Sequence, residues 1–273
     1  MRDFDLIALQ KCELEVLKEF VRICDKHNLK YYVAWGTLLG AVRHQGFIPW
    51  DDDIDVCMPY DDYLKFKQVC ETELGSDYFY EDWYAHHDYF LFWAKLRKNN
   101  TTCMTRREAK LKMHWGVCVD IFPLIPLEEQ KLPLNKKIAK ACLNLFVQRA
   151  HLPYLGDSTS KKVKKFVYAI LPKSLDHKVI RRCYRVLGNC KKEAKYMYDF
   201  CNSLEKICLE KEVFGEGKLY PFEDMKVNGP SDANTYLTRA YGDDYMVIPP
   251  VEQQVNHGDI IVDIHKDYTY YQK

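Results

Sequence analysis

The fold and the chemistry of this 273-residue chain are indicated first by one stretch, Trp50-Asp51-Asp52-Asp53-Ile54-Asp55-Val56. Alternate side chains of a strand share a face, so Asp53 and Asp55 are expected to point one way, with Ile54 and Val56 on the other face. Two carboxylates about 6–7 Å apart along a strand can hold divalent cations between them. The plainer interpretation is a solvated acidic turn, but these aspartates enter an apolar strand, where bare carboxylates are costly.

A third carboxylate, Asp120, lies inside the apolar run 117–122, which predicts another strand. An ionised side chain there must be hydrogen-bonded, ion-paired or metal-bound, and a hydrogen-bonded structural aspartate is the alternative to a ligand. Together, Asp53, Asp55 and Asp120 form a three-carboxylate site on adjacent strands. Such a site suits phosphoryl transfer, in which Mg²⁺ or Mn²⁺ neutralises developing charge. We therefore predict these three residues as metal ligands and catalytic residues.

A turn of small residues, Gly36-Thr37-Leu38-Leu39-Gly40, ends 13 residues before Asp53. It lies between a predicted strand and a predicted short helix, where exposed backbone N–H groups bind phosphate. Gly36, Thr37 and Gly40 are therefore candidate phosphate-binding residues, although a plain strand-to-helix turn explains them equally well. Arg43 and His44 follow one to two turns onward. They are candidates to bind a phosphate, and a surface position without a function is the alternative.

Periodicity and composition predict an α+β fold. Helices are expected over residues 6–28, 38–43, 61–73, 134–150, 160–171, 175–190, 191–212 and 232–241. Strands are expected over residues 31–35, 54–58, 78–80, 89–96, 101–105 and 117–122, the last ended by Pro123. We divide the chain into a catalytic core (1–130) with flanking helices, an inserted helical segment (131–215) and a return segment that packs on the core (216–273).

The inserted segment is strongly basic. Residues 131–195 contain 17 Lys and Arg against three acidic residues, a net charge of +14, so the rest of the chain carries −13 to give the overall +1. A basic face suits an anionic acceptor or the inner leaflet of a membrane, and an ordinary solvated face is the common alternative. The near-neutral total gives no sign of a nucleic-acid partner.

Composition also excludes several classes of protein. A hydrophobic share of 47% with 29% charged residues rules out a mainly disordered chain. The 11 cysteines show no C-x-x-C spacing, which favours buried, reduced thiols over a zinc ribbon or thioredoxin motif. The sequence has no signal-peptide pattern and no apolar run of about 18 residues, so we expect a cytoplasmic protein, with peripheral membrane contact left open.

At this point the residues resemble a known family. Gly36 to His44, Gly46 to Val56 and Met58-Pro59 look like the signature of the LicD family. Val119 to Leu124, Tyr241 to Met246, Pro249-Pro250 and Val255-Asn256-His257 also fit it. The resemblance runs from about residue 9 to residue 257 and is weakest in the basic helices. It implies a nucleotidyltransferase-like fold with a mixed-sheet core, in which a Gly-Ser/Thr turn, a D-x-D strand and a later acidic residue correspond to Gly36-Thr37, Asp53/Asp55 and Asp120.

The resemblance also implies an activity. Bacterial LicD proteins are phosphocholine transferases that use CDP-choline to decorate teichoic acids or lipopolysaccharide. The related fukutin and fukutin-related protein transfer ribitol phosphate from CDP-ribitol; the zinc-finger loop of the latter has no counterpart here. The chain therefore resembles the bacterial branch, with CDP-choline as donor and a teichoic acid or lipid-linked glycan precursor as acceptor. In this scheme metal held by the three aspartates binds the diphosphate, and an acceptor hydroxyl attacks the distal phosphorus as CMP leaves.

Further residues are candidates around that site. Lys95 and Arg97 alternate on a strand and either neutralise phosphate or lie on the surface, and His257 with Asn256 is a candidate to close the site. Quaternary ammonium is usually held by aromatic faces, so choline binding is expected among the tryptophans, of which most are otherwise explained as core packing. The candidates are Trp35, Trp50, Trp93 and Trp115. Transfer of another CDP-linked alcohol phosphate, and non-catalytic binding of a nucleotide or teichoic acid, remain the alternatives.

Overall fold

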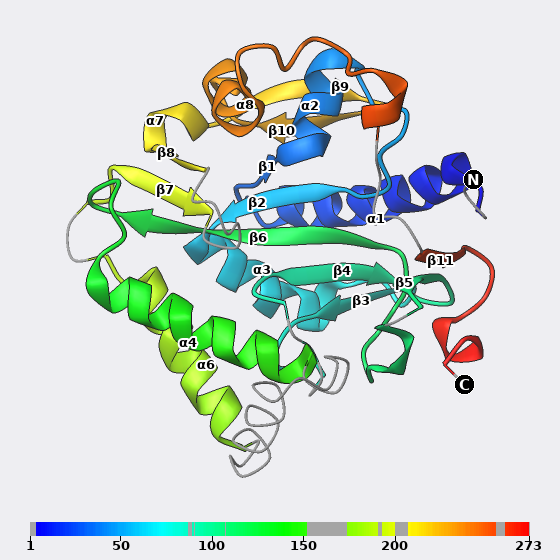
Figure 1. Cartoon of the computed structure of the whole chain (residues 1–273), viewed down its shortest axis with the longest axis horizontal. Coiled ribbons are helices and arrows are strands. Elements are labelled where there is room, and N and C mark those ends of the chain that lie inside the picture. The colour runs from blue at the N-terminus through cyan, green and yellow to red at the C-terminus, as the bar shows by residue number, and fades with distance from the viewer. Residues whose placement is uncertain are drawn as a thin grey trace.

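A mixed sheet of seven strands forms the centre of the molecule (Figure 1). The computed structural model describes residues 4–86, 89, 91–106, 108–151, 174–190, 193–199, 207–254 and 260–272. The strands follow the order β1–β2–β6–β4–β3, and β7 pairs with both β6 and β8. Their bounds are β1 Tyr32–Val33, β2 Asp55–Pro59, β3 Tyr78–Glu81, β4 Ala94–Lys98, β6 Cys118–Leu127, β7 Tyr196–Asp199 and β8 Cys208–Glu210. Among these described strands only β2 and β6 run parallel.

Helices and two small hairpins surround this sheet. The helices are α1 Leu6–Lys26, α2 Trp35–Arg43, α3 Tyr60–Glu73, α4 Leu134–His151, α6 Ser174–Gly188, α7 Lys211–Phe214 and α8 Ala233–Tyr241. The small sheets pair β9 Lys218–Phe222 with β10 Met225–Gly229, and β5 Thr102–Thr105 with β11 Ile260–Asp263. In Figure 1, α2, α8, β9 and β10 gather on the β1–β2 side of the sheet, and α4 and α6 form an antiparallel pair on the other side. The expected α+β class is confirmed.

One face of the sheet is apolar and is covered by helices. Val56 and Ile121 are register partners in β2 and β6, and Leu96 and Val119 are partners in β4 and β6. All four are fully buried in one cluster with Phe20 of α1 and Phe66 of α3. Because strand side chains alternate, the residues between them point to the opposite face, and that face carries the polar side chains.

Two sequence predictions about strands are wrong. The strand that was expected to end at Pro123 continues to Leu127. Proline lacks an N–H, and Pro123 lies between the last β4 partner, at Ile121, and the first β7 partner, at Leu124, so this break in the antiparallel pairing tolerates it. The helix predicted over 191–212 instead contains β7, β8 and the start of α7, because pairing with the end of β6 overrides local composition.

Other boundaries agree within a few residues. Trp35 begins α2 rather than ending a strand, and β4 begins at Ala94 rather than at Tyr89. The helix predicted over 160–171 lies outside the described residues. The division into three segments stays a prediction, although β7 and β8 join the main sheet from within 131–215. Within the described residues, no helix has the length and hydrophobicity that a membrane span requires.

Candidate active site

A row of charged residues crosses the polar face of the sheet. Asp55 of β2 is the register partner of Asp120 of β6. Asp120 is in turn the partner of Lys95 of β4, and Lys95 is the partner of Glu81 of β3. Because partners across a ladder share a face, four neighbouring strands present their charges side by side.

Lys95 neutralises part of this row. Its Nζ donates to Asp120 Oδ1, and both side chains are only 14% exposed. Burial opposes the charge of Lys95, but the charges of Asp120 and Cys118 outweigh burial and raise the pKa of the lysine. A buried ion pair therefore occupies one oxygen of the Asp120 carboxylate.

Asp55 is the most perturbed carboxylate of the row. Burial raises its pKa well above the ordinary range, and the charges of Asp53, Asp120 and Asp51 raise it further, with Lys95 acting in the opposite direction. Crowded carboxylates of this kind are relieved by a proton or by a cation. The cluster is therefore suited to hold positive charge.

The predicted phosphate turn lies directly against this cluster. The Asp55 N–H donates to Thr37 Oγ1 at 2.8 Å, and the Ala34 N–H donates to the Asp55 carbonyl at 2.9 Å. A Cβ on Gly36 would lie 2.6 Å from Asp51 Oδ2, so a larger residue here would require that carboxylate to move. A Cβ on Gly40 would lie 2.4 Å from the Gly46 carbonyl oxygen, which is a packing requirement. Thr37 thus positions the strand that carries Asp55.

Helix α1 supplies a carboxylate that the sequence reasoning missed. Glu13 is 2% exposed, and its Oε2 has no hydrogen-bond partner among the described residues. Burial raises its pKa well above the usual value, and Asp53, Asp52 and Asp51 contribute in that order. The available signal was a glutamate at a core position of the apolar stripe, between Leu9 and Val16.

Helix α1 holds the loop that carries the aspartates. Gln10 of α1 donates from Nε2 to the Asp51 carbonyl at 2.9 Å. Asp53 lies just before β2, which begins at Asp55, so the alternation expected from a strand applies only from Asp55 onward. Asp51 and Asp53 nevertheless lie near enough to Asp55 to raise its pKa.

Arg43 and His44 join α2 to the segment after α8. Arg43 donates from Nη1 to the Tyr245 carbonyl at 2.8 Å and from Nε to His44 Nε2 at 2.9 Å. Burial, and then Arg43, lowers the pKa of His44. The guanidinium lies 6.0 Å from the centre of the Trp50 ring. The contacts with Tyr245 and His44 therefore already use two of the three guanidinium nitrogens.

Two of the predicted tryptophans lie on the polar face beside the carboxylates. Trp35 adopts a φ of +46°, a region that bulky residues rarely occupy, and its Nε1 donates to Asp199 Oδ2 at 3.0 Å. Trp93 packs against Phe122 with ring centres 5.0 Å apart, and its buried Nε1 has no partner among the described residues. Phe122 lies two residues from Asp120 on the same face of β6.

The structure places the remaining predicted residues elsewhere. Arg97 is 1% exposed, pairs with Glu81 and donates from Nη1 to the Gly116 carbonyl at 3.1 Å. Trp115 is 5% exposed in a second core cluster, where Arg97 lies 5.5 Å from its ring centre. His257 lies outside the described residues.

A divalent cation is only partly matched by this arrangement. Carboxylate oxygens are the ligands that Mg²⁺ and Mn²⁺ prefer, and the burial and mutual repulsion that raise the pKa of Asp55 favour a cation. In the described part of the chain, however, no three Asp, Glu, His or Cys side chains are grouped so as to hold a metal ion. The oxygen ligands therefore suit Mg²⁺ or Mn²⁺. In this structure, however, the positive charge beside Asp120 is supplied by Lys95.

Comparison with known proteins gives consistent matches. Residues 28–136 match the family described as LicD/FKTN/FKRP, nucleotidyltransferase domain. The lipopolysaccharide cholinephosphotransferase LicD of Haemophilus influenzae is 29% identical over 271 residues, which cover 94% of this chain and 97% of that protein. The ribitol 5-phosphate transferase FKRP of Homo sapiens is 35% identical over 69 residues, which cover 24% of this chain and 14% of that protein. The matched domain contains α2, β2 and most of β6.

Proposed function

This chain is a member of the LicD family with a nucleotidyltransferase-like fold, and we propose that it transfers phosphocholine from CDP-choline to a sugar hydroxyl of a teichoic acid or another cell-surface glycan precursor. The observation that carries this proposal is the pairing of Asp55 with Asp120 beside the Gly36-Thr37 turn. Clustered carboxylates next to a helix N-terminus suit the handling of a diphosphate.

The described residues divide the work of the reaction. The N-terminus of α2 faces the acidic cluster and offers backbone N–H groups to phosphate oxygens. One of the three aspartates, Asp120 by our assignment, takes the proton of the acceptor hydroxyl. The hydroxyl oxygen then bonds to the distal phosphorus, and the bond to the CMP oxygen breaks.

We propose that Asp53, Asp55 and Asp120 hold Mg²⁺ or Mn²⁺ during turnover. Such an ion neutralises negative charge on the diphosphate. Because Lys95 binds only Oδ1 of Asp120 in this structure, the ion would use the other oxygen of that carboxylate.

The choice of donor rests on aromatic side chains. Choline is a cation without hydrogen-bond donors and suits an aromatic face near a carboxylate. Trp35 and Trp93 provide such faces on the polar side of the sheet, with Asp199 beside Trp35. A ribitol donor would instead require several polar partners for its hydroxyls. We also propose that the protein acts in the cytoplasm, at the inner face of the membrane where lipid-linked acceptors lie.

The test is an incubation of the full chain with CDP-choline, Mn²⁺ or Mg²⁺ and a GalNAc-containing acceptor, with release of CMP as the measurement. We expect acceptor-dependent CMP release, faster from CDP-choline than from CDP-ribitol or CDP-glycerol. Faster release from CDP-ribitol would favour transfer of another alcohol phosphate. Binding of CMP without release from any donor would favour a non-catalytic binding protein.

A further inference from the structure

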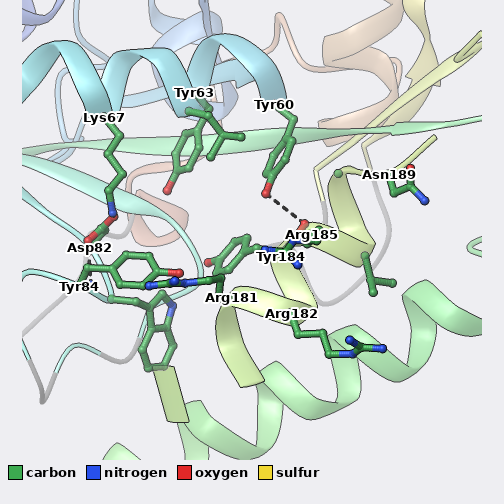
Figure 2. A pocket seen from close by; sticks show the side chains of 14 residues that line it. Tyr60, Tyr63, Lys67, Asp82, Tyr84, Arg181, Arg182, Tyr184, Arg185 and Asn189 are labelled. Atoms are coloured by element: carbon green, nitrogen blue, oxygen red, sulfur yellow. Dashed lines mark hydrogen bonds and ion pairs between the residues drawn. The ribbon is translucent and has the colours of Figure 1, made fainter. Parts of the chain in front are cut away.

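A second hollow lies on the opposite side of the sheet from the carboxylates. It is a cavity of about 670 Å³ between α3, the turn after β3 and α6 (Figure 2). Phe66 of α3 contacts Tyr80, which shares the apolar face with Leu96, so α3 covers the face that Asp120 and Lys95 do not use. The volume is in the range of sites that hold small molecules.

The walls of this pocket are fixed to one another. The Tyr60 hydroxyl of α3 donates to the Tyr184 carbonyl of α6 at 3.0 Å (Figure 2). A Cβ on Gly188 would lie 2.0 Å from the Tyr60 ring, so glycine permits the close approach of the end of α6 to α3. The pocket is therefore largely preformed in the free protein.

Positive charge dominates the lining. Arg181, Arg182 and Arg185 of α6 line the cavity and are exposed, and none forms an ion pair within the described residues. The lining includes one further cation, Lys67, and it pairs with the acidic Asp82 (Figure 2). The described lining thus carries a net charge of +3, four cations against one carboxylate.

Aromatic rings form much of the remaining lining, and cations already lie on one of them. Lys67 Nζ lies 3.9 Å from the centre of the Tyr84 ring, and Arg181 lies 5.6 Å from it. A quaternary ammonium would meet like charges here, so the pocket does not suit choline. An anion would meet guanidinium groups, which bind phosphate through paired hydrogen bonds.

We propose that this pocket binds a phosphorylated sugar, with its phosphate on Arg181 and Arg185 and a face of the sugar ring against Tyr60 or Tyr63. The C–H face of a sugar ring packs on aromatic carbon, and its hydroxyls match tyrosine hydroxyls and the Asn189 amide. A concave pocket favours a compact ligand over a membrane surface, which requires a flat or convex contact. If the chain acts on a glycan, which rests on the proposed function, this pocket holds a part of the acceptor remote from the reacting hydroxyl.

The test measures binding directly and needs no turnover. Glucose 6-phosphate, inorganic phosphate, unphosphorylated glucose and CMP are titrated separately into the full chain by calorimetry. We expect glucose 6-phosphate to bind more tightly than inorganic phosphate, and its affinity to fall with added salt. Glucose alone should give no measurable heat. The double variant Arg181→Gln and Arg185→Gln, which replaces two exposed arginines, should bind glucose 6-phosphate at least tenfold more weakly. The matched control is Lys178→Gln, exposed on the same helix but outside the lining, with affinity unchanged within twofold.

Each other outcome overturns the proposal. Equal affinity of the double variant and the native chain for glucose 6-phosphate, or no binding by the native chain, removes the sugar phosphate site. Loss of CMP binding in the double variant makes the pocket the nucleotide site. Flotation of both chains with phosphatidylglycerol vesicles is measured as well. If the double variant loses flotation and neither chain binds glucose 6-phosphate, the pocket is a membrane contact. CMP release from CDP-choline is measured in parallel, so that failure of this pocket is distinguished from failure of the proposed activity.

Discussion

Asp55 and Asp120 are register partners in the parallel pair of β2 and β6, and Lys95 binds Asp120 from the other side. Two carboxylates that repel each other are thus placed side by side by backbone pairing alone. The helices on the far face keep the two strands in this register, because a shift by one residue would turn Val56 and Ile121 out of the core. The fold therefore maintains a concentration of negative charge that a lone strand would avoid.

The first prediction concerns the three aspartates. Asp53→Asn, Asp55→Asn and Asp120→Asn should each reduce CMP release below about a tenth of the native rate, because each removes charge stabilisation from the transition state. Asp61→Asn, on the exposed surface of α3, is the control and should keep full activity. Mn²⁺ should raise the melting temperature of the native chain but not of the three variants. A variant that keeps more than a tenth of the activity is not a metal ligand.

The second prediction isolates the ion pair. Lys95→Met should destabilise the fold by about 3 kcal/mol, because it leaves Asp120 buried beside Asp55 without its counter-charge. Adding Asp120→Asn to that variant should restore most of the loss, as measured by urea unfolding of the four chains of a double-mutant cycle. Strictly additive effects would show that the two side chains do not interact in solution.

The third prediction concerns the contact of α2 with the acidic loop. Gly36→Ala should lower activity at least tenfold, because the new Cβ would displace the Asp51 carboxylate. The melting temperature should hardly change, because the higher helix propensity of alanine, roughly 1 kcal/mol over glycine, balances the cost of displacing the Asp51 side chain. Gly75→Ala, where the nearest atom is 3.4 Å from the new Cβ, is the matched control. Equal activity of the two variants would mean that the position of Asp51 is unimportant.

The fourth prediction concerns stability and pH. The Gly116 N–H donates to His114 Nδ1 at 3.1 Å, so this ring is held neutral; burial, and then Arg97, lowers its pKa from 6.5 to about 4. The unfolded chain binds this proton first, so the stability contributed above pH 6.5 is lost as pH falls from 6.5 towards 4. The loss is on the order of 3 kcal/mol. His114→Gln should make the free energy of unfolding depend less on pH between 6.5 and 4. His265→Gln, on the surface, should leave that pH dependence unchanged.

The fifth prediction separates tryptophans near the site from those in the core. Trp93→Leu or Trp35→Leu should raise KM for CDP-choline about 2- to 30-fold without changing CMP binding, the scale of a lost cation–π contact. Trp115→Leu should instead lower the melting temperature and leave KM unchanged, because its ring packs in the second core cluster under Arg97. A rise in KM for Trp115→Leu alone would place choline elsewhere.

Local sequence patterns were enough to predict many of the helices and strands and the chemistry of the acidic residues. Helical periodicity located α1 and α3, and carboxylates embedded in apolar strands marked Asp55 and Asp120, because each such charge requires a partner. The motifs from Gly36 to Val56 indicated the family whose domain matches residues 28–136. These features are local in the chain, so neighbouring residues are enough to reveal them.

Which charged side chains contact one another became clear from the folded chain alone. Lys95 and Arg97 look equivalent in the sequence, yet one binds Asp120 and the other is buried against Glu81. Glu13 reaches the acidic loop because α1 packs beneath it, and β7 became a strand because the end of β6 offered it a partner. Contacts between distant segments depend on register and packing, and no local pattern encodes them.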